Sequence, residues 1–313
     1  MCQARSPVTV AGALMALVAS IASPACIHAQ NSVPKTLASF PNGTFLENLT
    51  VAADGSIIFT SYFGKSLQRL ADGELQEPLA SLDVYPVGII AVADGYVVTA
   101  HGKAFTDAPA FLNTNKILLL SKDGRVRQTI DTPDARFLNG LVAISSRRVL
   151  IADSVRGVIW AFDPSSGMIT PWLEDETLTL DPATQPFRPA ANGLKIHRGT
   201  LYVSNSSRGT IHRIAIDAKG NASAKPQLLV QSGPVDDFAI DNDGTVYAST
   251  HGDRLLKISP VGAVTAILDE GCDGCTSVAI VSKGAKRTLL ILTTGKFAEG
   301  GKLPARVLQV PLR

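Results

Sequence analysis

A segment that recurs six times constrains the fold of this chain more than any other feature. Each copy has a short apolar strand, a tight turn that often holds Gly, and a second apolar strand. The copies begin at residues 47, 87, 139, 192, 236 and 276, so successive starts lie 40 to 53 residues apart. Blades of β-propellers recur about every 40 to 50 residues. The spacing therefore predicts an all-β fold, a six-bladed β-propeller that forms one domain over residues 30–313.

The two ends of the chain predict how the ring closes. The last repeat supplies strands over 287–294 and 305–312 but has no residues left for an outer strand. Residues 34–40 precede the first repeat and can pair there, which leaves no strand edge exposed. We expect an N-terminal strand to complete the last blade.

The first 29 residues have the pattern of a secretory signal peptide. Arg5 precedes an apolar stretch over 8–21, and small residues follow it. This stretch is shorter than the roughly 20 residues that a bilayer requires. We predict cleavage after residues 1–29, a secreted or periplasmic protein, and no attachment to a membrane after cleavage.

Charge excludes one class of partner. The chain has 29 Lys and Arg against 27 Asp and Glu, a formal net charge of +2, and no basic run. Nucleic-acid binding needs a concentrated basic surface, so we expect no nucleic-acid partner. We expect a monomer that binds a small and hydrophobic molecule.

Four polar residues open innermost strands and should meet in the central channel. Their carboxylate and amide oxygens form a set of hard ligands that suits Ca²⁺, with Mg²⁺ and Mn²⁺ as alternatives. The alternative is that they only hydrogen-bond the turns at the strand starts. The predicted metal ligands are Glu47, Asn139, Asn192 and Asp236.

A second group of residues ends the second strand of each repeat, at the same mouth of the ring. Long loops at that mouth carry aromatic side chains, and such loops often form binding sites. His101 and His251 are candidate proton-transfer residues beside Asp236. The predicted substrate pocket contains Tyr62, Phe105, Phe111, Asp153 and Asn205.

Two cysteines remain after the predicted cleavage. Cys272 and Cys275 lie in the run Gly-Cys-Asp-Gly-Cys-Thr between strands. A zinc site would need further Cys or His nearby, and a redox motif would need a helix N-terminus. In an oxidising compartment we predict a structural disulfide between them.

These motifs resemble the senescence-marker-protein-30/gluconolactonase-like family of six-bladed propellers. The resemblance rests on 46–48 before an Asp-Gly turn, on Asn139-Gly140, on 192–194, on Val235-Asp236 and on 275–279. In that family a Glu, two Asn and an Asp hold one divalent cation. The resemblance therefore implies the same four ligands here, with Asp236 as general base.

Two departures bear on the substrate. Sugar-lactone hydrolases of the family have Glu-Gly-Pro at the first site, where this chain has Glu47-Asn48-Leu49. They also have an Arg where this chain has Phe137, and Arg136 should point the other way by strand alternation. The sequence of these motifs is more similar to a subgroup from fungal metabolite clusters that includes hetero-Diels–Alderases.

Two functions follow from the sequence. In the first, the protein is a metal-dependent hydrolase of a lactone or ester, with the metal polarising the carbonyl and Asp236 as the base. In the second, the cavity binds a hydrophobic metabolite without hydrolysis, as a pericyclase similar to the hetero-Diels–Alderases or as a ligand-binding protein.

Overall fold

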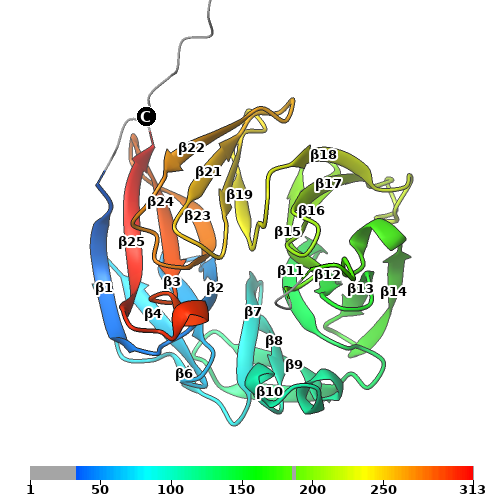
Figure 1. The fold of residues 1–313 in the computed structure, drawn as a ribbon. Coiled ribbons are helices and arrows are strands. Elements are labelled where there is room, and N and C mark those ends of the chain that lie inside the picture. Colours follow the sequence, from blue (N-terminus) through cyan, green and yellow to red (C-terminus); the bar gives the residue numbers. More distant parts are fainter. Residues whose placement is uncertain (1–32, 185–187, 313) are drawn as a thin grey trace, which may run out of the picture.

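The described part of the chain is a closed ring of six sheets. The structure is a computed structural model that describes residues 33–184 and 188–312. Five of the sheets have four strands, and the first blade adds a short fifth one (Figure 1). The predicted six-bladed all-β propeller is confirmed. The predicted signal peptide, residues 1–29, lies outside the described residues.

The strands follow the blades in chain order. Blade 1 contains β2 (Leu46–Val51), β3 (Ile57–Ser61), β4 (Ser66–Ala71), β5 (Glu74–Leu75) and β6 (Ala80–Ser81), and blade 2 contains β7 (Tyr85–Val92), β8 (Gly95–His101), β9 (Asn115–Ser121) and β10 (Val126–Asp131). Blade 3 contains β11 (Leu138–Ser145), β12 (Arg148–Asp153), β13 (Val158–Asp163) and β14 (Met168–Glu174), and blade 4 contains β15 (Ala191–His197), β16 (Thr200–Asn205), β17 (Thr210–Ala215) and β18 (Gln227–Gln231). Blade 5 contains β19 (Phe238–Ile240), β20 (Val246–Ser249), β21 (Leu255–Ile258) and β22 (Val264–Leu268), and blade 6 contains β23 (Cys275–Lys283), β24 (Lys286–Thr293), β25 (Pro304–Leu312) and β1 (Lys35–Asn42).

Helical structure in the described residues is limited to single 3₁₀ turns in loops. These are η1 (Phe105–Asp107), η2 (Ala110–Asn113), η3 (Glu176–Leu178) and η4 (Phe297–Glu299). No helix in the described ranges is long and apolar enough to cross a membrane.

The ring closes as the sequence predicts. β1 pairs antiparallel with β25, with Lys35 opposite Gln309 and Asn42 opposite Pro304. Phe40 of β1 also contacts Phe59 of blade 1, with ring centroids 6.0 Å apart. The N-terminal strand therefore completes blade 6 and packs against blade 1.

The hydrophobic core lies in six layers, one between each pair of neighbouring blades. Between blades 1 and 2, for example, Ile58 and Leu67 pack with Val98 and Leu118. Equivalent layers fill the other five gaps. Each blade therefore has an apolar layer on both of its faces. Because side chains alternate along a strand, a strand contributes to both layers, which explains the apolar runs in the sequence.

Glycine allows the inner strands of neighbouring blades to approach closely. A Cβ at Gly140 would lie 2.4 Å from the carbonyl oxygen of Asn192, and one at Gly88 would lie 2.4 Å from that of Asn139. Hydroxyl groups then connect the blades, because Thr99 and Ser204 each donate at 2.8 Å to the first inner-strand carbonyl of the next blade. These contacts fix the inner strands around the axis.

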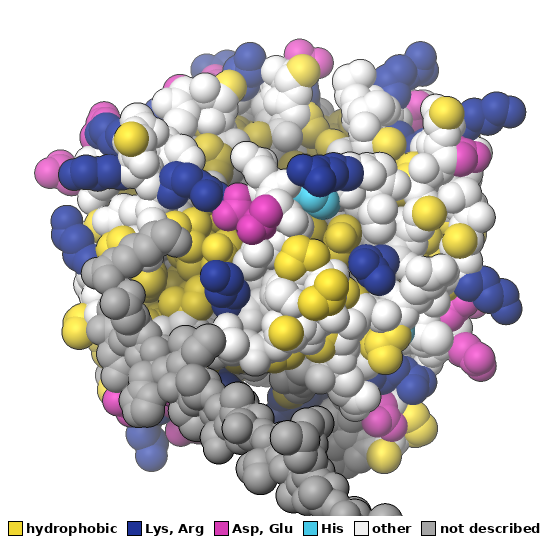
Figure 2. All heavy atoms as spheres, turned by 90° about the horizontal axis from the view of Figure 1, so that it is seen from above, with side chains coloured by type: hydrophobic (Ala, Val, Ile, Leu, Met, Phe, Trp, Pro, Cys, Tyr) yellow, Lys and Arg dark blue, Asp and Glu magenta, His cyan; other side chains and the backbone are white. Residues whose placement is uncertain are grey.

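The outer strands face solvent. On the side of the ring shown in Figure 2, hydrophobic patches are separated by basic and acidic side chains that are intermixed. Exposed apolar side chains include Leu228 of β18 and Val261 in the turn between β21 and β22.

Candidate functional site

The first residues of the inner strands place polar side chains at one mouth of the channel. Asn139, Asn192 and Asp236 occupy matching positions in blades 3, 4 and 5 and are each at most 3% exposed. Glu47 has the same position in blade 1. The structure thus places all four predicted ligands at equivalent positions of the ring. A hydrogen bond connects Asn192 with Asp236, and the charge of Asp236 acts on Glu47.

Asp236 is the most highly connected of the four. Its Oδ1 accepts a hydrogen bond of 2.7 Å from Nδ2 of Asn192. Its Oδ2 lies 3.0 Å from Nδ1 of His251, an ion-pair contact that is off the direction of a hydrogen bond. One carboxylate oxygen is therefore fixed by blade 4, and the other remains available to a ligand or proton.

The surroundings of Glu47 favour the protonated form of its carboxyl. Burial raises its pKa well above the usual 4.5, and the nearby charges of Asp236 and Asp237 raise it further. Its Oε2 is buried without a hydrogen-bond partner in the described chain. Burial raises the pKa of Asp236 as well, while His251 and Asn192 lower it. Two acidic groups therefore share a site that favours a positive charge.

His251 is the accessible member of the cluster. It follows β20 in a left-handed backbone conformation, with φ of 60°, and 27% of its side chain is exposed. Non-glycine residues in this conformation are strained and are frequent at functional sites. The loop thus holds the imidazole beside Asp236 at some conformational cost.

Ser206 completes the hydrogen-bonding network. Its hydroxyl donates to the carbonyl of Val235 at 2.6 Å and accepts from Nδ2 of Asn192 at 3.0 Å. Nε2 of His251 lies 3.2 Å from the same oxygen. Because the hydroxyl hydrogen is already donated, Nε2 must carry the proton in this contact. Ser206 is fully buried, so it orients His251 and is not placed to attack a ligand.

Asp237 points to different partners than Asp236. Its Oδ2 accepts from Asn48 at 3.1 Å and from Ser277 at 2.7 Å, and its Oδ1 pairs with Lys195. These partners come from blades 1, 6 and 4. Asp237 therefore connects four blades below the channel mouth, whereas Asp236 faces the channel.

The polar atoms that lack partners fit a divalent cation. Glu47 Oε2 and Asp236 Oδ2 are buried without hydrogen-bond donors. Asn192 donates through Nδ2, which leaves its oxygen free. Within the described residues no three His, Cys, Asp or Glu cluster as a metal site. The predicted set has only two carboxylates, so its fit depends on the amide oxygens.

Tyr62 and His101 form a buried pair beside the channel. The Tyr62 hydroxyl accepts from the backbone of Phe105 at 2.8 Å and lies 3.0 Å from Nδ1 of His101. Burial lowers the pKa of His101 to about 3, and its side chain is fully enclosed. His101 is therefore neutral and bonded to Tyr62, which favours a positioning role over the predicted proton transfer.

Asp153 and Asn205 are held by the fold and do not line a pocket. Asp153 is fully buried and accepts from four backbone N–H groups and from the Trp160 indole. Asn205 is also fully buried, and it donates to the carbonyls of Thr177 and Thr179. Their predicted contact with a substrate has no support in the geometry, because their polar atoms already have partners.

Aromatic residues from four loops form a cluster at the mouth. Predicted pocket residue Phe105 contacts three residues that the sequence interpretation missed, with ring centroids 5.3 to 5.9 Å away. These are Phe45, Phe63 and Phe297, all partly exposed. Phe111 is instead buried against His101.

Phe137, which stands where the sugar-lactone hydrolases have an arginine, lies in the same aromatic region. Phe137 packs on His101 at 4.8 Å and on Phe111 at 5.4 Å. Arg136 points elsewhere and bonds Asn113 on the outer side. The mouth is therefore apolar where sugar-lactone hydrolases would have a cation.

Cys272 and Cys275 are free thiols in the structure, so the predicted disulfide is not formed there. Both are fully buried. Contact with Cys275, together with burial, raises the pKa of the Cys272 thiol. The Cys275 thiol donates to the carbonyl of Arg254 at 3.2 Å. Hydrogen bonds and packing therefore stabilise this loop.

A six-bladed propeller with an acidic and amide-rich cluster at one mouth defines the class of this molecule. Residues 188–296, which include Asn192, Asp236 and His251, match the SMP-30/gluconolactonase/LRE-like region. The resemblance found in the sequence is thereby confirmed.

Individual relatives are distant. A protein from Phoma sp, named as a candidate hetero-Diels-Alderase, is 24% identical over an alignment of 298 residues that covers 78% of this chain and 83% of that protein. The fold is similar to that of a calcium-binding protein, regucalcin, from Agrobacterium tumefaciens, with a TM-score of 0.66, 14% identity and coverage of 89% and 93% of the two chains. A gluconolactonase from Xanthomonas campestris gives a TM-score of 0.65, 13% identity and 91% coverage of each chain. The fold is thus gluconolactonase-like.

Proposed function

We propose that this protein is a metal-dependent hydrolase of a lactone or ester. The observation that carries the proposal is the pair of buried acidic oxygens, Glu47 Oε2 and Asp236 Oδ2, that lack hydrogen-bond donors. With Asn139 and Asn192 they would hold a divalent ion, Ca²⁺ first, with Mg²⁺ or Mn²⁺ as alternatives. Such an ion would supply polarisation of the ester carbonyl.

Asp236 and His251 are the residues that move the proton in this proposal. Asp236 is the candidate base, with Asn192 fixing one of its oxygens. His251 lies next to the other oxygen and is partly open to the mouth. It can exchange a proton with a ligand there, while Ser206 keeps its ring oriented.

The aromatic cluster supports a hydrophobic substrate. Phe45, Phe63, Phe105 and Phe297 leave ring surface partly exposed next to the site. The same surface favours the alternative function, a non-hydrolytic propeller that binds a hydrophobic metabolite as a pericyclase or a ligand-binding protein. The relative named as a candidate hetero-Diels-Alderase supports this alternative.

We also propose export by the signal peptide of residues 1–29 and action as a secreted or periplasmic monomer. This part of the proposal rests on the sequence pattern alone.

Calorimetric titration with Ca²⁺, combined with a hydrolysis panel of lactones and aryl esters, tests the proposed function. We expect Asp236→Asn to lose metal binding and hydrolysis together. The control is Asp72→Asn, which removes the same charge at a side chain that is 95% exposed. If the wild type binds metal but hydrolyses no member of the panel, and apolar ligands still bind, the alternative function is the correct one.

A further inference from the structure

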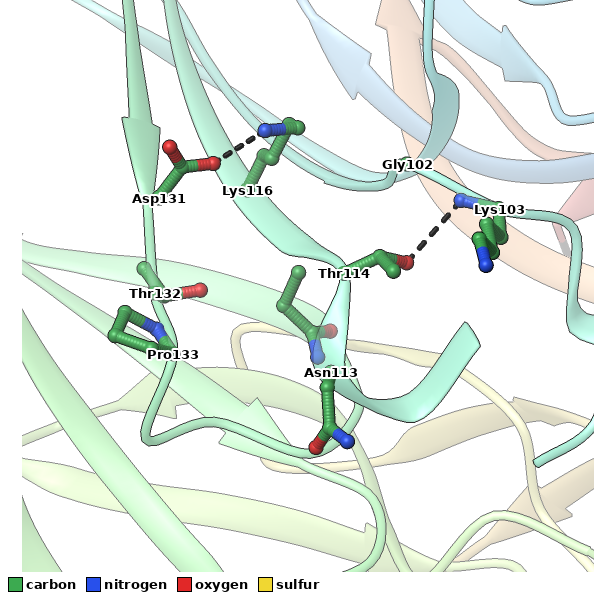
Figure 3. A pocket seen from close by; sticks show the side chains of 9 residues that line it. Gly102, Lys103, Asn113, Thr114, Lys116, Asp131, Thr132 and Pro133 are labelled. Carbon is green, nitrogen blue, oxygen red and sulfur yellow. Dashed lines mark hydrogen bonds and ion pairs between the residues drawn. The ribbon is translucent and has the colours of Figure 1, made fainter. Parts of the chain in front are cut away.

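A hollow on the flank of blade 2 lies apart from the channel site. It is open to solvent, has a volume of about 460 Å³, and is lined by residues just after β8, around the start of β9 and around the end of β10. Figure 3 shows Lys103, Asn113 and Thr114 on one side and Asp131, Thr132 and Pro133 on the other. None of the four proposed metal ligands lines it.

Thr132 brings an unpaired polar group to this hollow. The residue is only 2% exposed, and its hydroxyl oxygen has no hydrogen-bond partner in the described chain. Its backbone is satisfied by Asn115 and Ala135. In Figure 3 the hydroxyl points across the hollow toward Asn113 and Thr114. A buried hydroxyl without a partner is costly, so a ligand that bonds it gains that energy.

The other groups around the hollow are mainly donors. Lys103 is exposed, and its ammonium forms no ion pair among the described residues. Lys116 pairs with one oxygen of Asp131 and keeps further N–H groups. The side-chain oxygen of Asn113 already accepts from Arg136, which leaves the amide N–H groups. The hollow therefore has two ammonium groups and neutral donors against one acidic side chain.

We propose that this hollow binds a small hydroxylated carboxylate, such as an acidic sugar or a hydroxy acid. The carboxylate would accept from Lys103 and the Thr132 hydroxyl. The free oxygen of Asp131 would accept from a ligand hydroxyl. A volume of about 460 Å³ exceeds the need of a single ion and suits a molecule of this size.

This proposal does not depend on the proposed function of the channel. Two loops connect the sites. In the loop between β8 and β9, the Phe105 backbone bonds Tyr62 and Thr114 bonds Phe111. The loop between β10 and β11 runs from Thr132 to Phe137. A ligand in the hollow would hold these loops from the outside. Asp236→Asn should therefore leave binding in the hollow unchanged.

Calorimetric titration of the full chain with D-galacturonate at low salt tests the proposal, with D-galactose as the neutral comparison. We expect galacturonate to bind and galactose to bind at least about tenfold more weakly, since hydrogen bonds to charged groups exceed neutral ones. Lys103→Ala should weaken galacturonate binding about fivefold or more, and added salt should weaken it further. Lys122→Ala removes an exposed lysine from the far turn of the same blade and should have no effect.

Thr132→Val separates binding from folding. Valine keeps the shape and removes the unpaired hydroxyl, so melting temperature should stay equal or rise while galacturonate binding falls. Equal affinity for galactose and galacturonate, no binding of either, or unchanged affinity in Lys103→Ala would each overturn the proposal.

Discussion

Asp236 and Asp237 are adjacent in the chain, yet their carboxylates have no side-chain partner in common. Asp236 contacts Asn192 and His251 at the channel mouth. Asp237 contacts Asn48, Ser277 and Lys195 between the blades. Successive residues of the extended segment before β19 face opposite ways, which directs Asp236 to the channel and Asp237 to the contacts between blades.

Replacing Asp236 and replacing Asp237 by asparagine should therefore have opposite effects on stability. Asp236→Asn keeps the shape and removes a buried charge, so we expect equal or higher stability without metal and no stabilisation by Ca²⁺. Asp237→Asn should lower the free energy of unfolding by about 1–3 kcal/mol, because it weakens bonds from three blades. Melting curves with Ca²⁺ and with chelator measure both. A wild type that melts identically in Ca²⁺ and chelator would remove the metal site.

Stability without metal should depend on the protonation of Glu47. Its folded pKa lies above the unfolded value of 4.5, so this stabilisation is complete below pH 4.5 and is lost as pH rises through the folded pKa. Glu47→Gln cannot ionise and should lose less stability toward neutral pH, which denaturant unfolding in chelator would measure. The control Glu77→Gln changes an exposed side chain. Parallel pH profiles for wild type and Glu47→Gln would contradict the prediction.

His101 should make the stability depend on pH in the opposite direction from Glu47. Its folded pKa of about 3 lies below the ordinary 6.5, so its contribution is complete above pH 6.5 and is lost as pH falls toward the folded value. The loss reaches about 2 kcal/mol at pH 5, at about 1.4 kcal/mol per pH unit. His101→Gln should be less sensitive to acid than the wild type over this range, as urea unfolding at each pH would show. An equal acid sensitivity would mean that His101 is not held neutral.

Closure of the ring by β1 should be essential for stability. Deleting residues 31–40 removes most of the strand that pairs with β25 and the Phe40 contact with Phe59. Loss of Leu37 and Phe40 from their cluster should cost about 3 kcal/mol or more. The control deletes residues 31–34, which end before β1. Thermal unfolding compares the two deletion variants, and equal melting temperatures would contradict closure of the ring by β1.

Gly140 should tolerate no side chain. Gly140→Ala places a Cβ 2.4 Å from the Asn192 carbonyl, and relief of the clash would separate blades 3 and 4. We expect a loss of about 1–3 kcal/mol or more. Gly252→Ala is the matched control, because its nearest neighbour would lie 3.7 Å away. Denaturant unfolding that ranks the two variants equally would show that the inner strands can move apart.

The sequence by itself determined the ring. Six strand pairs at a regular spacing leave few other ways to bury apolar residues on both faces, and the missing last strand predicts closure by the N-terminus. It also determined the matching positions of Glu47, Asn139, Asn192 and Asp236, because these follow from the repeat. The residues after them were a further signal, since blades 2, 3 and 4 have Gly there while blades 1, 5 and 6 have Asn48, Asp237 and Ser277.

Only the tertiary structure decided what each side chain does. Asp153 and His251 end equivalent strands, yet backbone N–H groups surround the first, and a left-handed turn directs the second into the channel. Ser206 has the same repeat position as Tyr62, His101 and His251, but its role depends on partners from blade 5. The phenylalanine cluster likewise combines loops of different blades. Side-chain direction depends on local turns and on neighbouring blades, and the repeat encodes neither.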